Sequence, residues 1–142
     1  MPHFSRQNNL VTEGAYLDII VYPAKAIYDQ HQINKTQCPS ITVRALIDTG
    51  ATHSCIDEET VAQLLKLIAR DKQKVGNAGG SSEQFLYDAG FKLPLPSTPI
   101  IALQVFGIDL KIQPYKALIG RDVLKFSNFI YSGTSNYWSL IL

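Results

Sequence analysis

Short runs of alternating apolar and polar residues, interrupted by glycine and proline, dominate the pattern along the chain. Alternation with a period of two is typical of β-strands that bury one face. The predicted strands cover residues 15–22, 41–47, 84–87, 91–95, 100–106, 109–112, 129–131 and 137–142. The Gly-rich segment 74–82 suits the tip of a hairpin, because glycine adopts the backbone conformations that tight turns need.

One segment, residues 57–70, has clear helical spacing. Its apolar residues recur at intervals of three and four and are expected to lie in the core: Val61, Leu64, Leu65 and Ile68. Asp57 can cap this helix. A second short helix is predicted after Gly120, over residues 121–126. The fold class is therefore mostly β, a barrel or sandwich with one or two short helices.

The length of 142 residues predicts a single domain spanning residues 1–142, with residues 1–14 as a candidate flexible N-terminal extension. A hydrophobic content of 46% excludes a disordered chain. Charged residues make up 18%, below the roughly 25% of an average soluble domain, which favours self-association. The apolar segment 137–142 is expected to dock in a sheet, either its own or that of a partner.

Composition and motifs exclude several function classes. The net charge of +1, without a basic cluster, argues against a nucleic-acid partner. The longest apolar stretches, such as residues 100–106, fall short of the ~20 residues of a membrane span. No secretory signal is visible and the two cysteines are expected to be reduced, which predicts a cytoplasmic protein. Histidine spacing predicts no metal site, and no nucleotide-binding glycine loop or other cofactor motif is present.

His53 and Cys55 alternate, so a strand would place both on one face. A Cys/His nucleophile pair is therefore a possibility to weigh. No orienting motif follows these two residues, which favours a structural role for both.

The most informative residue is Asp48, which directly follows the apolar run 45–47. Gly50, two residues later, lets the backbone turn sharply and approach the carboxylate. Because a buried unpaired charge is costly, Asp48 needs hydrogen-bond donors, a cation or a shared proton. A second apolar run, Ala-Leu-Ile, precedes Gly-Arg-Asp at residues 120–122.

These motifs, in this order, resemble the retropepsin-like aspartic proteases, which comprise retroviral proteases and their bacterial and cellular relatives. The resemblance covers residues 15–142 and implies a closed β-barrel that forms one lobe of a homodimeric aspartic protease. Such an enzyme hydrolyses peptide or protein substrates with two carboxylates that share a proton. The chain has a single Asp-Thr-Gly, so each subunit of the homodimer would contribute its own Asp48.

By resemblance, the site comprises the catalytic Asp48, an active-site loop of Thr49, Gly50, Ala51 and Thr52, a flap tipped by Asn77, Ala78, Gly79 and Gly80, and structural support from Gly120, Arg121 and Asp122. Retroviral relatives carry an aspartate where this chain has Thr52, and that aspartate pairs with the arginine of the later motif. Arg121 therefore needs another partner, either in the other subunit or in Asp122. The segment 29–40 also falls outside the compact retroviral pattern.

Two other functions remain open. The fold can serve as a catalytically silent module for dimerisation or peptide binding. Asp-x-Gly-x-Thr at residues 48–52 also matches the first phosphate loop of actin-like ATPases. Those proteins need two large lobes, for which 142 residues are too few.

Overall fold

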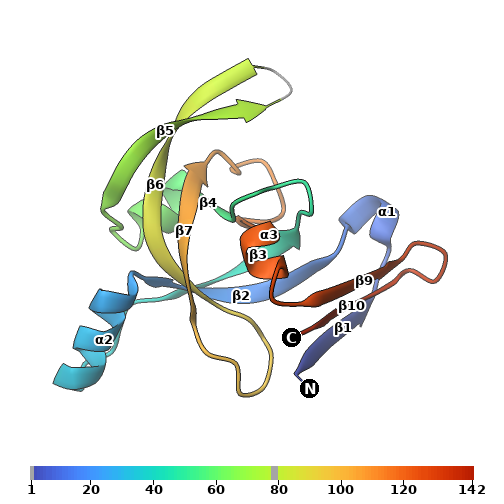
Figure 1. Ribbon diagram of the computed structural model, residues 1–142, viewed down its shortest axis with the longest axis horizontal. Helices are drawn as coiled ribbons and strands as arrows, with labels where there is room; N and C mark the ends of the chain where they lie inside the picture. The colour runs from blue at the N-terminus through green and yellow to red at the C-terminus, as the bar shows by residue number, and fades with distance from the viewer. Residues whose placement is uncertain (1, 78–79) are drawn as a thin grey trace.

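A closed β-barrel forms most of the structure (Figure 1). The computed structural model describes residues 2–77 and 80–142. Around the barrel, neighbouring strands are β2 (Tyr16–Pro23), β3 (Ile41–Ile47), β8 (Ala117–Ile119), β4 (Cys55–Asp57), β7 (Ile101–Ile108) and β6 (Gly80–Lys92). Pairing of β2 with β6 closes the ring. The fold is thus the mostly β barrel expected from the alternating pattern.

The barrel interior is filled from alternate positions of its strands, as the pleat of a strand requires. In β2, Leu17, Ile19 and Val21 are all buried, and Ala45 and Ile47 of β3 join them. β5 (Ala69–Asn77) lies outside the ring and pairs only with β6. The β5–β6 hairpin therefore extends beyond the barrel, as Figure 1 shows.

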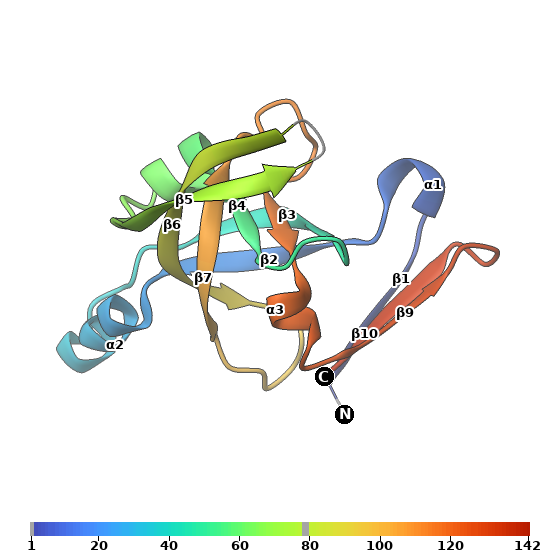
Figure 2. The ribbon, with the colours of Figure 1, turned by 45° about the horizontal axis from the view of Figure 1, so that its top comes forward.

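A separate three-stranded sheet stands beside the barrel, at the end opposite to α2 (Figure 2). Its order is β1 (His3–Gln7), β10 (Tyr137–Ile141) and β9 (Asn128–Ser132), all antiparallel. Trp138 and Leu140 are fully buried, which confirms that the apolar C-terminal segment docks in a sheet. Residues 3–13 form β1 and the short helix α1 (Leu10–Glu13) rather than a flexible extension, because β1 pairs along its length with β10.

The helix predicted over residues 57–70 is much shorter and of another type. A π-helix, η1 (Glu58–Gln63), begins after Asp57, whose side chain caps it as predicted. Lys66 then adopts φ of 55°, which ends the helical path, and Ala69 already begins β5. Leu64 and Ile68 are consequently 65% and 83% exposed, so their placement in the core was wrong.

Three further elements differ from the pattern-based prediction. Helix α2 (Lys25–Asn34) was missed because it buries none of its residues and so shows no apolar stripe. The strands expected at 84–87 and 91–95 belong to one continuous strand, β6, which passes through Gly90. Residues 109–112 form a turn instead of a strand, whereas α3 (Arg121–Leu124) follows Gly120 as predicted. Among the described residues, no helix is both long and apolar enough to cross a membrane.

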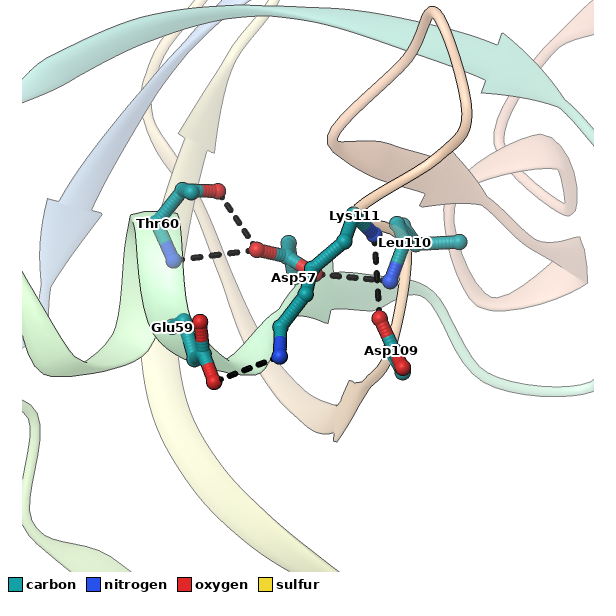
Figure 3. A network of polar contacts seen from close by, with 6 residues as sticks. All are labelled: Asp57, Glu59, Thr60, Asp109, Leu110 and Lys111. Carbon is teal, nitrogen blue, oxygen red and sulfur yellow. Dashed lines mark hydrogen bonds and ion pairs between the residues drawn. The ribbon is translucent and has the colours of Figure 1, made fainter.

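Asp57 anchors the loop between β7 and β8 to η1 (Figure 3). The side chain is 1% exposed, and one carboxylate oxygen accepts hydrogen bonds from the backbone N–H and the hydroxyl of Thr60, at 3.0 and 2.6 Å. The other oxygen accepts from the Leu110 N–H at 2.7 Å. On the outside, Lys111 forms an ion pair of 2.8 Å with Glu59. One buried carboxylate therefore joins a helix start to a loop more than fifty residues away.

Burial alone would raise the pKa of Asp57, but the hydrogen bonds from Thr60 and Leu110, with the charge of Lys116, outweigh it and lower the pKa below 3.8. A carboxyl group with a depressed pKa in the folded state stabilises the fold above its unfolded pKa. That contribution is lost as the pH falls through the lower, folded pKa.

We expect Asp57→Asn to lower the free energy of unfolding at pH 7 by about 3 kcal/mol, because the amide nitrogen cannot accept a hydrogen bond. Urea unfolding between pH 7 and pH 3 measures this effect, and the difference from the wild type should shrink as the pH falls. Asp109→Asn is the matched control, since Asp109 is exposed and, among the residues that the structure describes, accepts a hydrogen bond from the nearby Lys111 N–H alone, at 3.0 Å. A loss no larger than that of Asp109→Asn would contradict this role.

Candidate active site

Asp48 emerges at the end of a buried pair of parallel strands. β3 and β8 pair in parallel, with Ile47 opposite Ile119, and both of these side chains are buried. The backbone N–H of Asp48 continues the ladder by donating to the Ile119 carbonyl at 2.9 Å. Both strands have the apolar sequence Ala-Leu-Ile, and their pairing therefore fixes the position of Asp48 at the end of β3.

The loop after Asp48 turns back tightly on the carboxylate. The Gly50 N–H donates to Asp48 Oδ1 at 2.9 Å, and the Ala51 N–H donates to the Asp48 carbonyl at 3.2 Å. A Cβ at position 50 would lie 3.2 Å from Asp48 Oδ1, so glycine allows this close approach. The loop thus supplies a donor to the charged form of Asp48.

Asp48 faces a cleft of about 590 Å³ between the barrel and the β5–β6 hairpin. The cleft is lined by Asp48, Gly50, Ala51, Thr52, His53, Cys55, Gln73, Lys74, Gln84, Phe106, Ile108 and Leu118. Among the lining residues the structure describes, Asp48 is the one carboxylate. The cleft is large enough to hold several side chains of an extended peptide.

Arg121 braces the active-site loop from within its own chain. Its Nη1 donates to the Thr49 carbonyl at 2.8 Å, and its Nη2 donates to Thr52 Oγ1 at 2.9 Å. A planar guanidinium offers its N–H groups in a fixed fork, which suits two acceptors on one loop. The sequence left the other subunit or Asp122 as partners of Arg121. Thr52 instead accepts from it directly, in the position where retroviral relatives carry an aspartate.

Ser54 is the important site residue that the sequence analysis missed. It is fully buried, and its Oγ donates to Asp122 Oδ1 at 2.7 Å while accepting from the Gly120 N–H at 3.0 Å. The Ser54 N–H also donates to Asp122 Oδ2 at 2.9 Å. A signal was present in the sequence, since Ser54 lies two positions before the buried Ile56 and therefore on the same face of an extended chain.

Gly120 completes this junction by packing against backbone. A Cβ at position 120 would lie 2.8 to 2.9 Å from backbone atoms of His53 and Ala51. Arg121 follows at once, and its N–H donates to the Ala51 carbonyl at 2.8 Å. The motif at residues 120–122 and the loop after Asp48 therefore form one hydrogen-bonded unit.

Cys55 and His53 do not form a nucleophile pair. Burial, with smaller contributions from the charges of Asp122 and Asp48, raises the pKa of the Cys55 thiol to about 12. The thiol is protonated at neutral pH and donates to the His53 carbonyl at 3.6 Å. The His53 ring instead packs edge-on against Phe106, with centroids 5.4 Å apart.

Of the four residues predicted to form the flap tip, Asn77 ends β5 and Gly80 begins β6. Asn77 pairs with Gly80, whose φ of 119° is a conformation that side chains disfavour. Ala78 and Gly79 lie outside the described residues. No group of three or more metal-ligating side chains gathers within residues 2–77 and 80–142.

The barrel and its aspartate-bearing loop define a retropepsin-like aspartic protease fold. The family model described as retroviral aspartyl protease matches residues 29–128, and the chain belongs to this family. No curated protein matches the sequence significantly.

Of the solved structures that resemble this chain at low sequence identity, EIAV protease supports the same fold. EIAV protease, in complex with an inhibitor, is 21% identical with a TM-score of 0.51, over 85% of this chain and 93% of that one. A retropepsin-like aspartic protease from Rickettsia conorii is 16% identical, with a TM-score of 0.42 over 89% and 91% of the two chains. Simian foamy virus (mac) protease is 19% identical, with a TM-score of 0.44 over 60% and 82%.

We expect Ser54→Ala to lower the free energy of unfolding by about 2 kcal/mol, because Asp122 and the Gly120 N–H each lose a buried partner. Urea denaturation at pH 7 measures the loss. Ser139→Ala provides the control, since Ser139 is also buried but lies in β10, outside this junction. Equal losses in the two variants would show that the Ser54 hydrogen bonds contribute nothing specific.

Proposed function

We propose that this chain is an aspartic endopeptidase whose active site forms across a homodimer. The observation that carries the proposal is a lone carboxylate in a peptide-sized cleft: Asp48 is the one acidic residue among the described cleft-lining residues. Aspartic protease chemistry needs two carboxylates, so a second subunit has to supply the other.

The proposed reaction uses the two Asp48 carboxylates with one proton between them, because two like charges at close range cannot both ionise. The ionised carboxylate takes a proton from a water molecule, which attacks the carbonyl carbon of the scissile peptide bond. The protonated carboxyl group donates its proton to the carbonyl oxygen. Collapse of the tetrahedral intermediate then transfers a proton to the leaving nitrogen and breaks the C–N bond.

Other residues would act through position. The Gly50 N–H would hold the Asp48 carboxylate in place through its hydrogen bond of 2.9 Å to Oδ1. Thr49 would bond to the partner's loop, as the family resemblance implies. The β5–β6 hairpin would close over the bound peptide and exclude water, since β5 pairs on one side only and can bend without opening the barrel.

Asp88 is not a second catalytic carboxylate within the chain. It lies inside β6 and forms an ion pair of 3.1 Å with Arg70. Asp88 is also absent from the residues that line the cleft. This placement supports assembly of the site from two chains. A silent binding module with the same fold is the second candidate, and cleavage decides between them.

We expect Asp48→Asn to reduce cleavage of a peptide library by about 10³-fold or more, because the amide cannot accept the proton of the attacking water. Mass spectrometry of the products measures cleavage, and sedimentation checks that the variant keeps the mass of a dimer. Asp109→Asn, a surface substitution in the β7–β8 loop, should cleave like the wild type.

Mixed dimers test whether the site is shared. If wild-type and Asp48→Asn chains are refolded together in equal amounts, only pairs of two wild-type chains are active, so activity per total chain should fall to about a quarter. If each chain instead carried a complete active site, the mixture would retain half of the wild-type activity per total chain. A wild type that binds peptides without cleaving them would favour the silent module.

A further inference from the structure

The cleft has two chemically different sides. Phe106 and Ile108 of β7, with Leu118 of β8, give it an apolar side. Across from the barrel, the hairpin contributes Gln73 of β5 and Gln84 of β6. Both kinds of side chain border the same space as Asp48, so a peptide held there would meet apolar and amide groups together.

The strand register places the two glutamines as a pair. Gln73 and Gln84 are direct partners in the β5–β6 ladder, and opposed residues share one face of a sheet. Leu86, two residues beyond Gln84 and so on the same face, is buried and pairs with Phe106 of the cleft. The face that carries both glutamines is therefore the one turned toward the cleft.

Charged side chains occupy the other face of the hairpin. Lys72 and Lys74 alternate with Gln73, and Lys72 forms an ion pair of 3.1 Å with Glu83. Glu83 is the register partner of Lys74. Lys74 also borders the cleft, but its position in the alternation directs it away from the face of the glutamines. The hairpin thus offers the cleft two neutral amides, with the positively charged Lys74 at the border of the cleft.

A pair of primary amides selects for a group that both donates and accepts. A substrate carboxamide satisfies both needs, since it carries N–H donors and a carbonyl acceptor. Gln84 Nε2 already donates to Ser82 Oγ at 3.4 Å, and an apolar side chain would leave the remaining donors and acceptors of the two amides without partners, which costs binding. A substrate carboxylate would offer acceptors alone and would be repelled by the negative charge of the two Asp48 residues.

We propose that Gln73 and Gln84 form a specificity subsite for an asparagine or glutamine side chain of the substrate. A neighbouring apolar residue of the peptide would fill the space beside Phe106, Ile108 and Leu118. The inference rests on the proposed endopeptidase function, and it adds the class of peptide that the cleft accepts.

The test is cleavage of a peptide library in which Asn, Gln, Met, Leu, Glu and Lys are varied at each position around the cut. The wild type should prefer Gln or Asn over Met at one position by about tenfold, the value of one or two hydrogen bonds. Gln73→Met and Gln84→Met should lose this preference and cleave Met-containing peptides at least as well. Retained cleavage of those peptides also shows that the variants fold.

Lys72→Met is the matched control, because it changes the same strand on the opposite face and should keep the amide preference. Gln84→Glu should shift the preference toward Lys, since a carboxylate only accepts hydrogen bonds and is negatively charged. Cleavage by the wild type without an amide preference, or a preference that survives both methionine variants, would overturn the subsite while leaving the endopeptidase function intact.

A binding experiment tests the subsite even if the chain is not an endopeptidase. If the wild type cleaves nothing, fluorescence anisotropy with labelled, matched Gln and Met peptides still measures the subsite through binding. Tighter binding of the Gln peptide by the wild type, lost in Gln84→Met, would support the subsite. Equal affinity for the two peptides would refute it.

Discussion

The buried contact between Ser54 and Asp122 is the constraint on which the site depends. Ser54 is fully buried and bonds to both carboxylate oxygens of Asp122, at 2.7 and 2.9 Å. Hydrogen bonds to a charged acceptor are stronger than those between neutral groups, and burial removes competing water. The contact joins the segment after the Asp48 loop to the first turn of α3. The location of the Asp48 carboxylate is therefore set in part by residues that do not line the cleft.

The barrel gives this junction a rigid frame, and the hairpin above it has more freedom. β3, β8 and β4 lie side by side within a closed ring, so each has a partner on both edges. β5 has a partner on one edge only. Segments with fewer backbone partners open at lower free energy than the core. The structure thus combines a closed ring, which holds Asp48, with a hairpin whose outer strand has fewer backbone partners.

The local pattern of apolar and polar residues predicted those strands that bury one face and alternate strictly. β3 was placed at residues 41–47, as observed, because its alternation is strong, and the Asp48 loop follows from its motif. Helix α2 was not predictable, since a helix with no buried residue carries no apolar stripe. The helix expected over residues 57–70 failed because the β5–β6 pairing, a long-range interaction, takes Ala69 into a strand. The role of Ser54 required knowing that residues 54 and 122 meet.

The clamp between Arg121 and the active-site loop uses only neutral acceptors, the Thr49 carbonyl and the Thr52 hydroxyl. Neither group takes up a proton in the range where proteins unfold in acid, and the guanidinium stays charged throughout. An aspartate in the place of Thr52 would be neutralised as the pH fell, and its attraction for the arginine would weaken. The hydrogen bonds from Arg121 that support the loop around Asp48 therefore do not depend on a group that gains or loses a proton as the solution is acidified.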